Sequence, residues 1–97
     1  MKKTRIDKSR ERLVRAFYFA LGSYMEQEAK KEDQWRDQNL GQLYAHLKHE
    51  LEEIRRSMQS GNLTFLLHNC VDAVSLATIL LAKVMEMAGL FEGGAEK

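Results

Sequence analysis

The sequence contains no proline and only one cysteine, and both features limit the possible folds. Without proline, and with six glycines in 97 residues, a β-sandwich or a proline-rich linker is disfavoured and long helices are favoured. The single cysteine, Cys70, cannot form a disulfide within the chain. We therefore interpret Cys70 as a buried thiol and expect an intracellular protein.

Signals for secretion and for membrane insertion are also missing. The N-terminal residues do not show the basic segment followed by an apolar segment that is typical of a signal peptide. The longest apolar stretch, residues 71–87, is interrupted by Asp72, Lys83 and Glu86. We therefore expect no membrane span and no membrane partner, and a cytoplasmic location.

The overall composition is typical of one small soluble domain. A chain of 97 residues is too short for a two-domain enzyme, and its 44% of hydrophobic and 30% of charged residues are ordinary values. The net charge of +1 conceals an uneven distribution. Residues 1–15 hold seven Lys or Arg and two acidic residues (+5), and the remainder holds eight and twelve (−4). The basic segment has no aromatic residue before Phe17, so we expect a solvated helix face and no nucleic-acid partner.

The spacing of apolar residues predicts an all-α fold with three main helices. An N-terminal helix is expected over residues 7–31, a helical core over residues 35–88 and a disordered tail over residues 92–97. Apolar positions of the first helix recur every three or four residues, and Gly22 within it predicts a close helix contact or a bend. Asn39 and Gln42 form a capping-box pattern, so the second helix should begin near residue 40.

A short turn separates the second helix from the third. The second helix should run to about Met58, and Ser60, Gly61 and Asn62 should end it and cap the third. Because the turn is so short, the two helices must pack antiparallel. The third helix, over about residues 63–88, is apolar nearly all round, which two other helices of one chain cannot easily cover. We therefore expect a homodimer, or a larger assembly, that completes the bundle.

Polar residues on these helices form the candidate site. Glu50 and Glu53 are three residues apart, so their carboxylates project from adjacent turns on one side of the second helix. On the third helix, the polar residues that lie within about 60° of Asp72 are His68, Asn69 and Ser75. An aspartate on so apolar a helix is costly unless it is paired, protonated or bound to a cation. Antiparallel packing would bring these oxygen ligands together, and they suit Mg²⁺ or Mn²⁺.

Plainer interpretations of the same residues remain open. A Glu-x-x-Glu pair on a helix is most often a solvated face, and Asp72 could be a core residue paired with Arg or Lys. His46 and His68 flank the candidate site and could supply ligands for Zn²⁺, Mn²⁺ or Fe²⁺, although rim or hydrogen-bonding roles are more common. Trp35 could stack on a base or cover the start of the second helix.

The order and spacing of these residues resemble the MazG-like all-α nucleoside triphosphate pyrophosphohydrolases. The pattern Glu50-x-x-Glu53, fifteen residues, then Asn69-x-x-Asp72 is similar to the ExxE…ExxD signature of that family. A phage and prokaryotic branch has a tryptophan, a helix of L-x-x-L-x-x-E-x-x-E-L type, then E-C-A-D-V-A-N and a terminal D-K. The matching stretches here are Trp35 and residues 43–54, 69–75 and 82–83, so the resemblance covers about residues 35–88.

The resemblance implies a compact helical bundle that forms a dimer or a dimer of dimers. It implies an enzyme that cleaves a nucleoside triphosphate into a monophosphate and pyrophosphate, in nucleotide-pool house-cleaning. One to three Mg²⁺ ions, or Mn²⁺, would be held by four residues: Glu50, Glu53, Asn69 and Asp72. The carboxylates of this set would be catalytic, and the substrate-binding residues would be Trp35, His68, Ser75 and Lys83.

Three positions depart from the family pattern. Asn69 stands for an acidic residue, Ser75 for an asparagine and Ala82 for an aspartate. An amide oxygen still ligates Mg²⁺, but the site loses one negative charge, so we expect weaker metal binding. Two hypotheses follow: a pyrophosphohydrolase, which the retained acidic residues and Lys83 favour, and a catalytically weak or inactive helical interaction protein on the same scaffold, which the departures favour.

Overall fold

In a computed structural model, residues 2–31 and 34–91 are described, and all of their regular structure is helical. The chain forms α1 (Arg5–Lys31), a short 3-10 helix η1 (Gln34–Asp37), α2 (Leu40–Ser60) and α3 (Leu63–Met87). This confirms the prediction of an all-α fold with three main helices, and no strand occurs in the described ranges. The 3-10 turn was not predicted. The tail predicted at residues 92–97 lies outside the described residues.

Reciprocal side-chain caps set where α1 and α2 begin. The Thr4 hydroxyl accepts from the backbone N–H of Asp7 at 3.1 Å, and the Asp7 carboxylate accepts from the N–H of Thr4 at 3.2 Å. This pair explains why α1 begins at Arg5, two residues before the predicted start. Asn39 and Gln42 exchange two equivalent bonds of 2.8 Å, which confirms the predicted capping box of α2.

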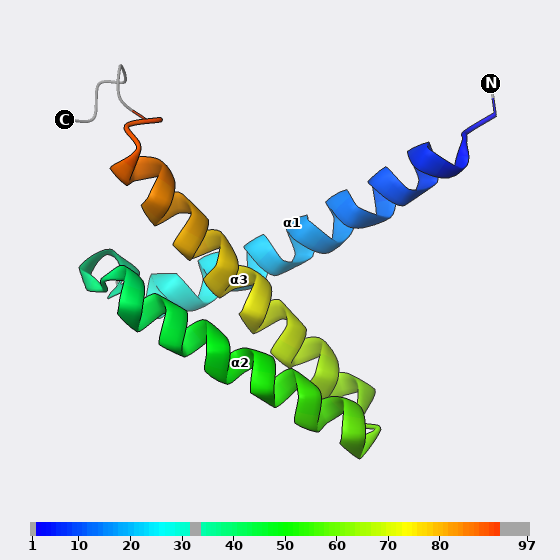
Figure 1. Cartoon of the computed structure of the whole chain (residues 1–97). Coiled ribbons are helices and arrows are strands. Elements are labelled where there is room, and N and C mark those ends of the chain that lie inside the picture. The colour runs from blue at the N-terminus through cyan, green and yellow to red at the C-terminus, as the bar shows by residue number, and fades with distance from the viewer. Residues whose placement is uncertain (1, 32–33, 92–97) are drawn as a thin grey trace.

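The turn between α2 and α3 has the predicted chemistry. Gly61 adopts a left-handed conformation, with φ of 76°, and its N–H donates to the Ser57 carbonyl at 3.2 Å. The Asn62 side chain accepts from the N–H of Phe65 at 3.0 Å and so caps α3. Two residues therefore suffice to reverse the chain, and α2 and α3 lie side by side as an antiparallel hairpin (Figure 1).

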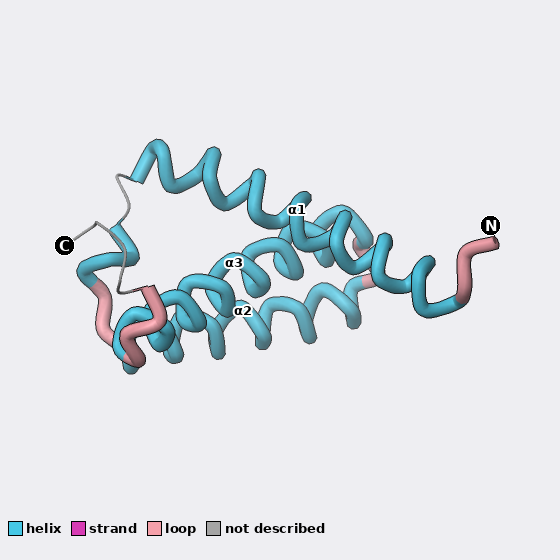
Figure 2. The backbone as a smooth tube through the Cα atoms, turned by 90° about the horizontal axis from the view of Figure 1, so that it is seen from above, coloured by secondary structure: helices cyan, strands magenta, loops and turns pink. Residues whose placement is uncertain are grey.

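Helix α1 crosses α3 instead of lying along it. Its C-terminal half passes over α3, and its N-terminal half projects beyond the hairpin (Figures 1 and 2). The radius of gyration is 16.0 Å, whereas a compact domain of about 100 residues has roughly 13 Å. The buried apolar residues are correspondingly few: Ala20, Leu43, Val71, Ala73 and Ile79. A single chain therefore has a small core.

Gly22 has no close neighbour in this arrangement. A Cβ built at this position would meet nothing within 4 Å. Within one chain no described helix therefore packs on Gly22, and the crossing with α3 is made by Ala20, two residues earlier, which is only 2% exposed.

Helix α3 is poorly covered by its own chain. By length and composition it is apolar enough to cross a membrane, a criterion that core helices of soluble proteins also meet. Only 22% of its most apolar window is buried within the chain. Most of this apolar helix is therefore left uncovered by its own chain.

Candidate functional site

A buried hydrogen-bond network joins α2 to α3 at the candidate site. The Asn69 amide nitrogen donates to the Ser57 hydroxyl at 2.6 Å and to the Glu53 carbonyl at 3.4 Å. The Ser57 hydroxyl in turn donates to the same Glu53 carbonyl at 2.7 Å. Asn69 is 5% exposed and Ser57 is fully buried. Since buried polar groups need partners, this network fixes the register of the two helices.

The register sets the two candidate motifs at the same level of the hairpin. Asn69 lies against the turn of α2 that begins at Glu53. In an antiparallel pair, one turn forward along α3 corresponds to one turn backward along α2. Asp72 therefore lies level with the turn of α2 that carries Glu50 and Glu53, as the sequence predicted for antiparallel helices.

Glu53 and Asp72 are directed to basic side chains of their own helices. Glu53 lies 3.3 Å from the Arg56 guanidinium and 3.8 Å from the His49 imidazole. Asp72 lies 3.4 Å from His68, one turn earlier on α3. Glu50, which is half-buried, has no ion-pair or hydrogen-bond partner among the described residues. Within residues 2–31 and 34–91, no three His, Cys, Asp or Glu side chains are close enough to hold a metal ion.

The predicted polar stripe of α3 divides between different neighbours. Asn69 is directed to α2, whereas Ser75 lines a pocket between α3 and α1. His68 is exposed, with 63% of its side chain accessible, and contacts Asp72. The His46 side chain is exposed on α2. These polar groups therefore do not converge on one point in the single chain.

Lys83 has a structural contact far from the carboxylates. Its ammonium group donates to the Arg36 carbonyl at 2.7 Å, and the Arg36 guanidinium lies 3.7 Å from Glu86. These bonds fasten η1 against the C-terminal half of α3. Trp35 lies within η1, but its side chain is outside the described part of the structure.

Glu52 and Arg55 form an exposed ion pair on α2. The Arg55 guanidinium donates to both carboxylate oxygens of Glu52. This hydrogen bonding, with the nearby positive charge, holds the pKa of Glu52 below its ordinary value and raises the pKa of Arg55. The predicted site residues Glu50 and Glu53 lie on either side of Glu52 in sequence, but the ion pair itself is solvated and indicates no chemistry.

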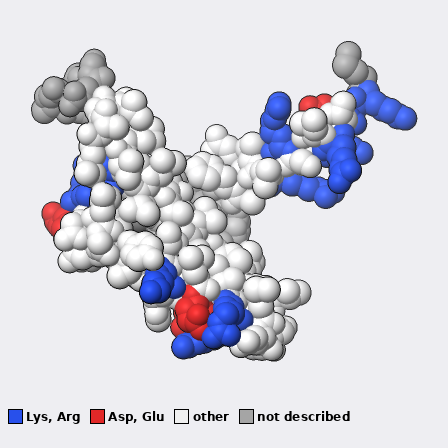
Figure 3. Space-filling view, in the orientation of Figure 1, with Lys and Arg blue, Asp and Glu red and all other residues white. Residues whose placement is uncertain are grey.

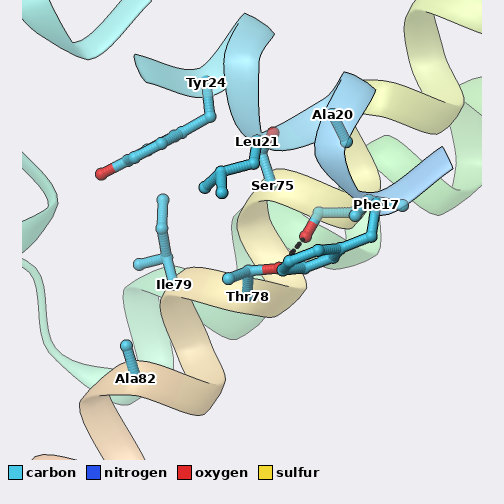
Figure 4. A pocket seen from close by; sticks show the side chains of 9 residues that line it. Phe17, Ala20, Leu21, Tyr24, Ser75, Thr78, Ile79 and Ala82 are labelled. Carbon is cyan, nitrogen blue, oxygen red and sulfur yellow. Dashed lines mark hydrogen bonds between the residues drawn. The ribbon is translucent and has the colours of Figure 1, made fainter. Parts of the chain in front are cut away.

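Sequence reasoning missed an apolar pocket of about 110 Å³ where α1 crosses α3 (Figure 4). Its lining comes from one stretch of each helix: Phe17, Ala20, Leu21, Tyr24, Val74, Ser75, Thr78, Ile79 and Ala82. The hydroxyl of the lining residue Thr78 donates to the Val74 carbonyl at 2.8 Å (Figure 4). The small residues Ala20 and Ala82 could have indicated a crossing, but not a cavity.

Comparison with known proteins adds no relatives. No family model matches this chain, and no curated protein or solved structure is significantly similar to it. Its function is therefore inferred from its residues and their geometry.

Proposed function

We propose that the protein is a Mg²⁺-dependent nucleoside triphosphate pyrophosphohydrolase with a weakened MazG-like site. The observation that supports this best is the α2–α3 register, in which Asn69 lies against the turn that begins at Glu53. That register aligns Asn69-x-x-Asp72 with Glu50-x-x-Glu53, which is the arrangement that the resemblance to the family requires. The hydrolysis would convert a nucleoside triphosphate to a monophosphate and pyrophosphate.

The donor set fits a hard divalent cation in its chemistry. It consists of carboxylate and amide oxygens, which Mg²⁺ and Mn²⁺ prefer. Asn69 uses its amide nitrogen on α2, so its oxygen can still serve as a ligand. Glu50 has no competing partner among the described residues, but Glu53 and Asp72 would have to exchange Arg56 and His68 for the ion.

Each residue of the proposed site has a defined task. A bound cation would neutralise phosphate oxygens and lower the pKa of an attacking water. Glu50, Glu53 and Asp72 would hold that charge between α2 and α3, and Ser57 would keep Asn69 oriented. Lys83 is proposed to steady the phosphates, for which it would have to release the Arg36 carbonyl.

The same network supports a second candidate, a catalytically inactive helical interaction protein. Asn69 is used as a buried hydrogen-bond donor to α2, a task that a glutamate could not perform. The described carboxylates also form no group ready for a metal. On this hypothesis Asn69 replaced a ligand with a structural bond, and the scaffold serves association alone.

Melting curves with added metal distinguish the two candidates. A cation that binds only the folded state raises the melting temperature by mass action, so the enzyme hypothesis predicts a rise with Mg²⁺ or Mn²⁺. Asp72→Asn should remove that response, whereas Glu52→Gln, a change of the same size outside the site, should preserve it. Pyrophosphate release from a panel of nucleoside triphosphates would identify the substrate. A wild-type protein that ignores both metals and releases no pyrophosphate would establish the second candidate.

We further propose that the assembly is a homodimer or a dimer of dimers. Of the apolar α3 residues expected to need a partner, Ile79 is buried within the chain, whereas Leu66, Leu76 and Leu80 stay partly accessible. Incomplete coverage of these residues supports the proposal, because a larger bundle would bury them.

A further inference from the structure

One side of α1 carries apolar residues from Ile6 to Tyr24, interrupted at Ser9 and Arg10, and only the C-terminal part of this stripe is covered. Residues on one side of the helix, within about 60° of one another at 100° per residue, are Ile6, Leu13, Phe17, Ala20 and Tyr24. The C-terminal part of the stripe packs on α3, where Ala20 is 2% exposed. The N-terminal part continues past α3, and there Ile6 and Leu13 are 69% and 71% exposed. The bare part thus continues an existing helix contact.

A second set of exposed apolar residues lies on α3, before and after the place where α1 crosses it. Helix α2 packs on the side of Asn69, and α1 packs on the side of Ser75 and Ile79. Leu67 and Leu81, seven residues before and seven residues after the pocket residue Val74, are 53% and 58% exposed. The N-terminal part of α1 projects away from the α2–α3 hairpin, so its exposed residues are free of both other helices (Figure 1).

The exposed area is large enough for a stable interface. The chain exposes 7933 Å², about 2,200 Å² more than a folded monomer of its mass is expected to expose. A standard interface removes only about 800 Å² from each partner. The excess accessible surface is therefore larger than the area that a standard interface with a second chain would bury.

Charge favours a second copy as the occupant. Lys and Arg gather on the projecting end of α1 (Figure 3). Residues 2–15 carry +5, whereas the other described residues, 16–31 and 34–91, carry −1, so the net charges of the arm and of the remaining described part have opposite signs. In a two-fold arrangement, each copy buries its projecting arm on the other copy, because each has one such arm and one exposed α3 surface.

We infer that the projecting N-terminal arm, residues 5–15, packs on a second copy of this chain, with Leu13 of each arm buried against the α3 of the other copy. The inference specifies the interface of the proposed homodimer, and it stands without pyrophosphohydrolase activity. A protein that lacks a metal response but dimerises through its arm would refute the proposed enzyme and leave this interface intact.

Sedimentation equilibrium of the full chain tests the interface. The wild type should sediment at twice its mass of 11.2 kDa at micromolar concentration. Leu13→Gln should weaken the dimer at least tenfold, since it places a polar group in the contact. Because Leu13 is exposed within one chain, this change should leave the helical content of the monomer unaltered. Arg15→Gln, the same replacement on the opposite side of α1, should change the dimer affinity less than threefold.

Two results would overturn the inference. One is a monomeric wild type, and the other is a dimer that Leu13→Gln does not weaken. The principal alternative for a basic, partly apolar helix is an anionic lipid surface. Flotation with phosphatidylglycerol-containing vesicles, compared with pure phosphatidylcholine vesicles, tests it. A monomer that floats only with the anionic vesicles would reassign the arm to a membrane.

Discussion

At the scale of single residues, Asn69 is the most informative position, because one side chain has to satisfy two requirements. A metal site of the expected kind requires oxygen at this position, whereas the hairpin requires a donor toward the Glu53 carbonyl and the Ser57 hydroxyl. Asparagine provides both an oxygen and an N–H₂ group, and glutamate provides oxygen alone. The departure from the family pattern therefore has a structural reason that the sequence did not show.

The first prediction concerns Asn69→Glu. The new carboxylate would be nearly buried beside a carbonyl oxygen, so the metal-free variant should be less stable than the wild type by about 1–3 kcal/mol. If the site binds metal, Mg²⁺ should restore more stability to this variant than to the wild type, because a fourth carboxylate strengthens binding. Denaturant unfolding with and without Mg²⁺ measures both quantities. Equal losses in the two buffers would mean that position 69 has only a structural role.

The second prediction concerns Lys83, which is proposed to bind phosphates but bonds to the Arg36 carbonyl. Lys83→Met should release η1 and so speed tryptic cleavage after Arg36 severalfold, since that carbonyl belongs to the scissile peptide bond. Lys48→Met, a change of the same kind on the exposed side of α2, should leave this rate unchanged. Unaltered cleavage in Lys83→Met would show that the bond does not hold η1 in solution.

At the scale of elements, local capping signals predicted the start of α2 and the turn between α2 and α3. The contacts between residues far apart in sequence were not predicted. Asn39 with Gln42, and Gly61 with Asn62, set helix ends through bonds between residues at most four apart, so their pattern is visible in the sequence. The division of the α3 stripe was not predictable, because it depends on where α1 crosses. A helical wheel places Asn69 and Ser75 on the same side of α3. In the structure, Asn69 bonds to α2, whereas Ser75 lines the pocket against α1.

The third prediction compares two glycines. Gly61→Ala should destabilise the protein by about 1 kcal/mol, because its φ of 76° disfavours any residue with a Cβ. Gly22→Ala should stabilise it by about 0.5–1 kcal/mol, because Gly22 lies within α1 and a Cβ there meets nothing within 4 Å. Chemical denaturation gives both values. A loss of stability in Gly22→Ala would indicate that a partner packs closely on that side of α1.

At the scale of the whole molecule, composition led us to expect a partner but did not indicate which surface would contact it. The apolar character of α3 was apparent from the sequence, whereas the crossing of α1, and hence its bare half, depends on packing between segments some sixty residues apart. By contrast, the side-chain partners of Glu53 and Asp72 lie three or four residues away on the same helix, so their spacing is visible in the sequence.

The fourth prediction is that thermal stability depends on protein concentration. If folding and association are coupled, the melting temperature should rise by several degrees for each hundredfold increase in chain concentration, because dilution favours separated chains. The dependence should be smaller in Leu13→Gln, whose arm no longer contributes to the contact. A melting temperature constant from submicromolar to near-millimolar chain would show that one chain is stable alone.

The two-residue reversal at Gly61 and Asn62 has a consequence for the order of folding. The contacts between α2 and α3 are close in sequence, so they should form in a fast step whose rate is independent of concentration. Helix α1 packs on α3 through contacts far apart in sequence, and in the proposed dimer its projecting half is covered only after an encounter with a second copy. Refolding should therefore show a rapid gain of helix followed by a second-order phase. In that interval the bare hairpin is the species most exposed to aggregation, so the yield of refolded protein should depend on how quickly α1 docks.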